Sequence, residues 1–394
     1  MKKMSYLCGV IVKKGMNMIN PFVTKGYAGA AYFCDRERET KDLVRLLTNE
    51  NNMALISPRR MGKTDLIHHC FSQPAIVGKY YTFIIDIYAT CSLADFVDVL
   101  GQAIFEELKP LGRKVWEHFY NCLHSVQQQI SFDINGNPVW GIGLGAYVNP
   151  STTLEEIFGY LATADKPCLV AIDEFQKVMD YPNGQNVEAA LRTHIQRCPN
   201  ATFLFSGSKR HLMNEIFMSP SRPFYQSVIT MELSPIAEEK YAAFAERLFS
   251  EGGKALAPEV VHEVYSHFDG VTFCLQRVMN VLYMTTERGG LCSTNMIEDA
   301  INYILDLGSE HYEMLYSQMS EKQRSVFLAI ATERRVKSIA AGKFVHKYRL
   351  PSVSSVVSAA KGLLEKDFIT KENEEFFVYD HFFLLWLRKQ GYVK

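Results

Sequence analysis

At 394 residues the chain is longer than one hydrophobic core usually organises, so two or three domains are expected. Hydrophobic residues make up 47% and charged residues 22%, which is typical of a globular protein and excludes a disordered one. The formal net charge of −1 gives the whole molecule no electrostatic attraction to nucleic acid or membrane, so any basic patch must be local.

The beginning of the chain and its cysteines indicate a cytoplasmic protein. Residues 1–19 are predicted to be a tail, because the apolar run at residues 6–12 ends in two lysines and is too short to cross a membrane. Nine cysteines are spread along the chain without a CxxC pair. Reduced thiols explain that pattern better than disulfides or a zinc site do, and we expect no membrane segment.

The first chemical motif is a phosphate-binding loop at residues 56–64, Ile-Ser-Pro-Arg-Arg-Met-Gly-Lys-Thr, in which Ser57 replaces the usual first glycine. An apolar run precedes it and a helix-like run follows it, which is the setting of a nucleoside triphosphate site. Lys63 is expected to reach the β- and γ-phosphates, and the Thr64 hydroxyl to bind Mg²⁺. The expected nucleotide-binding residues of this segment are Ser57, Pro58, Arg59, Arg60, Met61, Gly62, Lys63, Thr64 and Asp65.

Beyond this loop, apolar runs alternate with segments of helical periodicity, as they do in proteins with a covered, mostly parallel sheet. The predicted strands are residues 53–56, 80–87, 168–173, 201–206 and 226–233. We therefore expect an α/β P-loop domain over residues 20–234, with helices on both faces of a parallel sheet. Residues 129–145 break the alternation and predict a hairpin insertion that turns at Asn135-Gly136.

Two more domains are predicted after this sheet. Residues 235–308 show helical periodicity interrupted at glycines and are predicted to form a helical lid. Residues 309–394 are predicted to form a winged helix. Its expected elements are helices at 321–332, 336–348 and 352–366, a hairpin at 368–379, and an apolar helix near the end.

An acidic pair supports nucleotide chemistry. The strand at residues 168–173 ends in Asp173-Glu174, where Asp173 is expected to hold Mg²⁺ through water. Glu174 is expected to act as the catalytic base that orients and deprotonates the attacking water, with Lys63 stabilising the transferred phosphoryl group. The alternative is an acidic turn with no chemical role. The loop and the pair together favour nucleotide binding, whereas a glutamate at this place does not by itself establish turnover.

Serines and arginines near the fourth strand are further candidates. In hydrolases with an extra strand between the phosphate loop and the acidic pair, a polar residue at the end of that strand senses the γ-phosphate, and Ser206 and Ser208 both fit. A serine that only ends a strand is the alternative. Arg192, Arg210 and Arg222 are candidates for an arginine finger, against the alternative of solvated surface arginines.

Six short motifs in this order resemble the archaeal-type ATPases of the STAND group of P-loop NTPases, over about residues 20–388. The motifs are Phe-x-x-Arg-Glu at 33–37, Pro-Arg-Arg-Met-Gly-Lys-Thr at 58–64, Ile-Asp-Glu-Phe-Gln at 172–176, Phe-Ser-Gly-Ser at 205–208, Ser-Pro-Ser-Arg-Pro-Phe-Tyr at 219–225 and Asp-His-Phe-Phe-Leu-Leu-Trp-Leu-Arg at 380–388. The resemblance implies an ASCE-type nucleotide domain, a helical lid and a winged helix. It also implies ATP as the nucleotide, with Phe33 and Arg36 beside the adenine and ribose.

Two positions depart from the family pattern. The family usually has glycine-proline where this chain has Gly270-Val271-Thr272, and its Tyr-Gly-Arg is here Tyr225-Gln226-Ser227. Both departures weaken the assignment of a lid contact or of an arginine that acts in trans.

The predicted winged helix raises the question of DNA binding. Residues 309–394 carry 14 basic and 10 acidic residues, but the predicted recognition helix is rich in serine and the predicted wing is acidic, with Glu372, Glu374 and Glu375. Readers of DNA sequence usually place several Arg, Asn or Gln residues on that helix. A protein partner is therefore favoured, and DNA is the alternative.

The sequence thus predicts an ATP-binding P-loop protein with Mg²⁺ as cofactor. The favoured function is a slow ATPase switch, which converts ATP and water to ADP and phosphate and couples the nucleotide state to the lid and winged helix. The alternatives are a nucleotide-gated DNA-binding regulator and a non-hydrolysing, ADP-bound protein-interaction module. Oligomerisation is compatible with each of them.

Overall fold

The computed structural model describes residues 20–125, 131–132, 138–140, 149–372 and 374–393. They fall into two compact units, which meet in the chain between Phe244 and Ala245. Each unit is described by itself.

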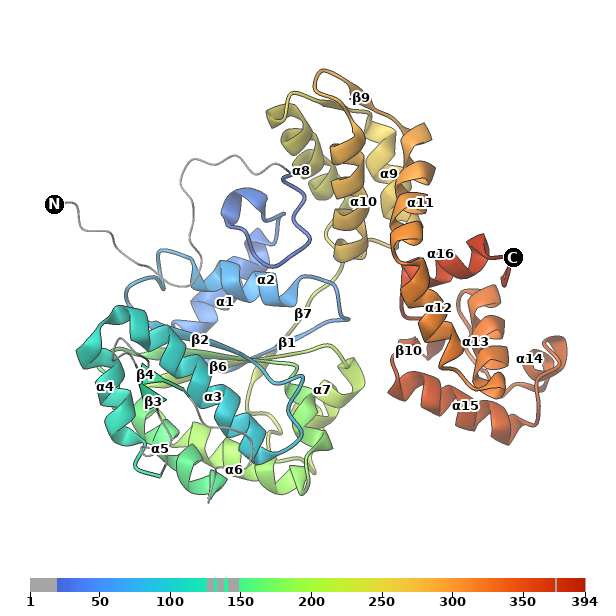
Figure 1. The fold of residues 1–394 in the computed structure, drawn as a ribbon. Coiled ribbons are helices and arrows are strands. Elements are labelled where there is room, and N and C mark those ends of the chain that lie inside the picture. Colours follow the sequence, from blue (N-terminus) through green and yellow to red (C-terminus); the bar gives the residue numbers. More distant parts are fainter. Residues whose placement is uncertain (1–19, 126–130, 133–137, 141–148, 373, 394) are drawn as a thin grey trace. The chain divides into compact units, whose positions relative to one another are not determined.

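The first unit is built on a five-stranded parallel sheet (Figure 1). Its strands are β1 (Met53–Ile56), β2 (Tyr81–Asp86), β5 (Cys168–Asp173), β6 (Ala201–Gly207) and β7 (Ile229–Glu232). Their order across the sheet is β2-β5-β6-β1-β7. The fourth strand in sequence, β6, therefore lies between the strand that precedes the phosphate loop and the strand that ends in the acidic pair. This sheet confirms the predicted α/β fold class.

Helices cover both faces of this sheet because its central strands β1, β5 and β6 are apolar on both sides. The helices of the unit are η1 (Ala30–Tyr32), α1 (Glu37–Leu47), α2 (Lys63–Phe71), α3 (Leu93–Leu108), η2 (Lys109–Leu111), α4 (Arg113–Cys122), α5 (Pro150–Thr163), η4 (Phe175–Asp180), α6 (Gly184–Gln196) and α7 (Arg210–Met218). Helices α1 and α2 bury one apolar cluster against Met53, Leu55 and Leu204.

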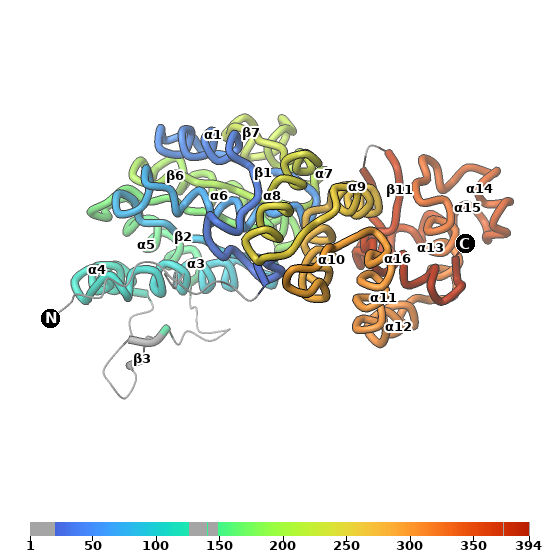
Figure 2. The backbone as a smooth tube through the Cα atoms, turned by 90° about the horizontal axis from the view of Figure 1, so that it is seen from above, coloured from blue at the N-terminus to red at the C-terminus, as the bar shows by residue number. Residues whose placement is uncertain are grey.

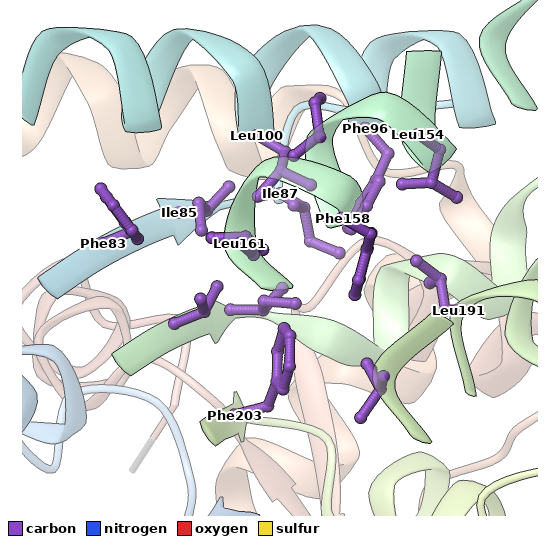
Figure 3. Packing of buried hydrophobic residues seen from close by; sticks show 14 of the residues in the cluster. Phe83, Ile85, Ile87, Phe96, Leu100, Leu154, Phe158, Leu161, Leu191 and Phe203 are labelled. Atoms are coloured by element: carbon purple, nitrogen blue, oxygen red, sulfur yellow. The ribbon is translucent and has the colours of Figure 1, made fainter. Parts of the chain in front are cut away.

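The larger apolar cluster lies on the opposite face of the sheet, under α3 to α7. Figure 3 shows Phe83 and Ile85 of β2 on the same side as Leu100 of α3 and Phe158 of α5. The two clusters use alternate residues of each strand, as the period of two in a β-strand requires. Near this cluster, β3 (Ser131–Phe132) and β4 (Pro138–Val139) pair antiparallel within the predicted hairpin of residues 129–145, whose turn lies outside the described residues.

The second unit starts within α8 (Glu238–Glu251) and is mainly helical. Its remaining helices are α9 (Pro258–His267), α10 (Thr272–Thr285), η5 (Thr294–Met296), α11 (Ile297–Leu307), α12 (Ser309–Ser317), α13 (Glu321–Glu333), α14 (Gly342–Lys347), α15 (Val353–Glu365) and α16 (His381–Lys389). A short parallel pair, β8 (Ala255–Leu256) and β9 (Leu291–Cys292), joins the turns that follow α8 and α10. Gly253 and Gly289, in those turns, have φ of 70° and 79°, which favours glycine.

The last helices and a hairpin form the winged-helix part of this unit. The hairpin consists of β10 (Ile369–Glu372) and β11 (Glu375–Val378), and Figure 2 shows α13, α14 and α15 grouped beside β11. The predicted helix at residues 336–348 is too long: only Gly342–Lys347 is helical. Val336 instead exchanges backbone hydrogen bonds with Phe376 of β11 (2.9 and 2.8 Å), so this residue extends the hairpin.

Helix α16 packs against α12 and against Phe268, which follows α9. Phe382 lies 5.0 Å from Phe268, and Phe383 stacks on Tyr312 at 5.5 Å between ring centroids. The buried Trp386 donates a hydrogen bond from its indole nitrogen to the Ser309 hydroxyl at 3.0 Å. The second unit therefore has a shared aromatic core. In the described part of the chain, no helix combines the length and the apolar character needed to cross a membrane.

Candidate nucleotide site

The carboxyl ends of neighbouring parallel strands bring the predicted metal ligands together. The Thr64 hydroxyl, in the first turn of α2, donates to Asp173 Oδ2 at 2.6 Å. The Ser206 hydroxyl, near the end of β6, donates to Asp173 Oδ1 at 2.5 Å. Asp173 and Ser206 are buried. A hydroxyl and a carboxylate in contact at a strand end form the small set of oxygen ligands that Mg²⁺ takes from proteins beside substrate phosphates.

The lysine of the phosphate-binding loop forms hydrogen bonds with the backbone of the same loop. Lys63 Nζ donates to the backbone oxygens of Ser57 (3.0 Å) and Pro58 (3.1 Å). Burial lowers the pKa of Lys63, and the negative charges of Glu174 and Asp173 oppose that shift. The ammonium group thus lies inside the loop, where phosphate oxygens can compete with the two carbonyls.

The backbone of the loop explains its sequence. Gly62 comes directly before α2 and has φ of 84°. A residue with a side chain would be strained at this φ, so glycine is favoured. Ser57 is fully buried, and its N–H donates to the carbonyl of Gly207 at 3.3 Å, so a serine is accommodated at the first position of the motif. Arg60 also has a positive φ, of 68°, and Met61 is buried. Asp65, in the first turn of α2, has a pKa raised by burial.

Glu174 is held by neighbours that follow β5 and β6. Its backbone is left-handed (φ 55°, ψ 39°). Carboxylate oxygen Oε2 accepts hydrogen bonds from the Ser208 hydroxyl at 2.7 Å and from the side-chain amide of Gln176. The other oxygen, Oε1, is 4.0 Å from Arg59 Nε in the phosphate-binding loop. The predicted catalytic base therefore has one oxygen bound and the other directed to the loop.

The two serine candidates contact different residues of the predicted site. Ser206 bonds the predicted metal ligand, and Ser208 bonds the predicted base. Sequence reasoning missed Gln176 and also Asp86, which ends β2 directly beside Asp173 in the sheet register. Burial is the main cause that raises the pKa of Asp86, and the negative charges of Asp173 and Glu174 raise it further. The signal for Asp86 was available, since an acidic residue ends that apolar run.

The two residues assigned by resemblance precede α1 and contact α1, α2 and the segment after β7. The Phe33 ring stacks on His69 of α2, with centroids 4.2 Å apart. Arg36 is buried and donates to Glu39 Oε1 (2.9 Å) and to the Ser234 carbonyl (2.8 Å). The guanidinium of Arg36 is thus engaged by α1 and by the segment after β7, while Phe33 belongs to an aromatic group beside the helix that follows the phosphate loop.

The three arginine-finger candidates are paired elsewhere. Arg222 is buried and forms an ion pair with the fully buried Glu188 at 2.5 Å. Arg210 pairs with Glu232 at 2.7 Å, and Arg192 donates to Gln196 at 3.2 Å. Because Arg222 is buried, it lacks the mobility that an arginine finger requires.

Among the residues described, no group of three or more His, Cys, Asp or Glu is placed to hold a metal ion.

Comparisons with known proteins place this geometry in a known fold. Residues 310–389 match the family model described as a probable winged helix domain. A comparison with curated proteins gives no match. Among solved structures, the chain is similar to the Walker-type ATPase of Pyrococcus abyssi, with 17% identity and a TM-score of 0.61 over 93% of this chain and 99% of that one.

Two proteins of Aeropyrum pernix have the same fold. The ORC1 protein, solved in complex with DNA, has 11% identity and a TM-score of 0.54 over 95% of this chain and 97% of that one. The ORC2 protein, solved as ADPNP–ADP complexes, has 13% identity and a TM-score of 0.54 over 90% and 94%. The likeness shows a P-loop ATPase fold followed by a winged helix.

Proposed function

We propose that this protein is an ATP-binding switch that hydrolyses ATP slowly and belongs to the archaeal-type ATPases of the STAND group. The observation that supports this most is the contact of Thr64 and Ser206 with the two carboxylate oxygens of Asp173, beside the loop that contains Lys63. ATP is favoured over GTP because no Asn-Lys-x-Asp tetrapeptide follows the fourth strand, and because the similar ORC2 protein was solved with adenine nucleotides.

The residues divide the work of hydrolysis. Lys63 and the loop N–H groups would bind the phosphates, and Phe33 would lie near the base. Thr64 would hold Mg²⁺ directly and Asp173 through water; the bound ion supplies charge that stabilises the transferred phosphoryl group. Glu174 would accept the proton of the attacking water. Changes at this site are proposed to alter the state of the second unit, which carries the lid and the winged helix.

The test has three parts on the full chain. First, the nucleotide released on denaturing the purified protein is identified, and ATP turnover is measured. Second, Lys63→Ala should lose nucleotide binding, whereas Lys114→Ala, an exposed lysine on α4, should not. Third, Glu174→Gln should bind ATP but turn it over about 10²–10⁴-fold more slowly. Turnover by Glu174→Gln at the wild-type rate would contradict the assignment of the base, and no binding by the wild type would contradict the whole proposal.

Tightly held ADP without turnover would favour the non-hydrolysing alternative. In that case the protein would act as a nucleotide-bound interaction module. The exposed side chains of Val353 and Val357 on α15, at 44% and 49%, support a protein partner in either case, since apolar side chains on a recognition helix do not bind phosphates.

DNA binding is the second candidate function, and two observations favour it. The winged-helix match covers residues 310–389, and the similar ORC1 protein was solved in complex with DNA. The charge pattern of the second unit opposes it, because Lys347, Lys371 and Arg335 are paired with carboxylates.

A further inference from the structure

Gln176 occupies a buried position directly beside the predicted base. It lies in η4, two residues after Glu174, and only 2% of it is exposed. Its side-chain Nε2 donates to Glu174 Oε2 and lies 3.4 Å from the Ser208 hydroxyl oxygen. Ser208 donates to the same carboxylate oxygen at 2.7 Å. Two donors from different strand ends thus converge on a single oxygen of Glu174.

The orientation of the amide is fixed by its surroundings. A carboxylate is only an acceptor, so the amide nitrogen and not the amide oxygen must face Glu174. The Gln176 Oε1 atom, on the other side, is buried and has no hydrogen-bond partner among the described residues. A buried acceptor without a partner is unfavourable, so its place here needs an explanation other than its own hydrogen bonding. The amide group therefore hydrogen-bonds Glu174 through its nitrogen, while its oxygen has no partner among the described residues.

The neighbouring strand leaves room for this amide. Gly207, at the end of β6, has no side chain, and a Cβ atom there would lie 2.5 Å from Gln176 Oε1 and 2.3 Å from Met213 Sδ. On the other side, Phe175 anchors η4 in an aromatic cluster, 4.5 Å from Phe205 and 5.4 Å from Phe224. The position of the Gln176 side chain is thus set by both β6 and the core.

We propose that Gln176 is a positioning residue for ATP hydrolysis, which together with Ser208 holds Oε2 of Glu174 so that Oε1 is presented to the attacking water. The inference rests on the proposed ATPase activity. Oε1 is the oxygen on the side of the phosphate loop, 4.0 Å from Arg59 Nε. In the step, Oε1 takes a proton from water, the water oxygen bonds the γ-phosphorus, and the bond to ADP breaks with its electron pair leaving on ADP.

The test removes the amide while keeping its volume. In Gln176→Met we expect kcat to fall by roughly 10- to 100-fold, as for other residues that orient a catalytic group, with the Kd for ATP unchanged. Ser208→Ala should lower kcat in the same direction, and Ser208→Thr, which keeps the hydroxyl, should restore it. The control Gln196→Met changes an exposed glutamine of α6 and should leave kcat unchanged.

A double-mutant cycle separates positioning from a general structural role. In a Glu174→Gln background, measured under single turnover, Gln176→Met should cause no further loss, because the group it orients is gone. An equal loss in both backgrounds, or a kcat of Gln176→Met within twofold of wild type, would overturn the inference. If Gln176→Met does not fold, the same cycle with Ser208→Ala decides. A wild type without turnover would instead overturn the proposed hydrolysis itself.

Discussion

Asp173 accepts a hydrogen bond on each carboxylate oxygen, and this double pairing determines what its replacement should do. In Asp173→Asn, one oxygen becomes an NH₂ group that cannot accept from Thr64 or Ser206 and cannot hold Mg²⁺ through water. We expect affinity for ATP in the presence of Mg²⁺ to fall by roughly 10- to 100-fold. Affinity measured in EDTA should change little, because the contacts proposed between Lys63 and phosphate do not involve Asp173. Equal Mg²⁺-dependence in variant and wild type would contradict the assignment of Asp173.

The buried Glu188, outside the nucleotide site, makes the free energy of unfolding depend on pH. Burial raises its pKa to about 7, against the lowering effect of Arg222, from an ordinary value of 4.5. Because the folded pKa is above the unfolded one, the folded protein binds the additional proton between about pH 4.5 and 7. The contribution of this group to stability therefore falls as pH rises through that window.

The measurement compares unfolding of wild type and Glu188→Gln at pH 5 and pH 8. The glutamine is neutral at both, so the stability of the variant relative to wild type should increase with pH, by up to about 3 kcal/mol. The control Glu215→Gln removes the half-exposed partner of Arg222, which lies 3.8 Å away, and should show a much smaller change. A relative stability of Glu188→Gln that falls with pH would mean that Arg222 outweighs burial.

Among whole elements, α16 brings the largest aromatic side chain, that of Trp386, into the core of the second unit. Trp386 is 3% exposed and lies against Tyr312 and Tyr392, at 6.1 and 5.9 Å between ring centroids. Trp386→Ala should lower the free energy of unfolding of this unit by about 3–5 kcal/mol, measured by denaturant titration. Trp386→Phe loses the hydrogen bond to Ser309. Its free energy of unfolding should therefore fall by about 1 kcal/mol more than the smaller side-chain volume explains. Leu307→Ala, at a position 69% exposed, is the control and should stay within about 0.5 kcal/mol.

The strands could be predicted closely from the sequence because buried parallel strands are unbroken apolar runs. The run at residues 168–173 matches β5 at both ends, and the acid that ends it is the predicted metal ligand Asp173. The helix predicted at residues 336–348 was too long at its start because Val336 pairs with β11, which no local pattern reveals. The role of Gln176 was hidden for the same reason, since its partner Ser208 is 32 positions away and meets it only through the strand order.

Over the whole second unit, acidic side chains neutralise much of the positive charge of the winged helix. Ion pairs join Lys347 to Glu333, Lys371 to Glu374, Arg335 and Lys337 to Glu375, and Lys361 to Glu365. The excess of basic residues therefore does not form a continuous stripe along α15. A phosphate backbone would have to compete with these carboxylates for the same cations.

We accordingly expect weak binding of duplex DNA, with a Kd of about 10⁻⁴–10⁻⁶ M at physiological salt and little dependence on DNA sequence. Fluorescence anisotropy over a series of salt concentrations, with ATP, with ADP and without nucleotide, checks this. Nanomolar binding with a steep salt slope in one nucleotide state would instead establish the DNA-binding regulator. Lys343→Ala, on α14, would then be expected to reduce that slope by about one.

The order of the strands also has a consequence for the synthesis of the chain. Strand β1 carries the phosphate-binding loop, yet both of its neighbours come late: Met53 is opposite Leu204 of β6 and Ile229 of β7. At a translation rate of about 5–20 residues per second, β1 waits roughly 7 to 30 seconds for its first partner. During that time its backbone and apolar side chains can bind a chaperone or another nascent chain. The segment that binds nucleotide is thus made early and completed late, and nucleotide can begin to favour the folded unit only after β6 has left the ribosome.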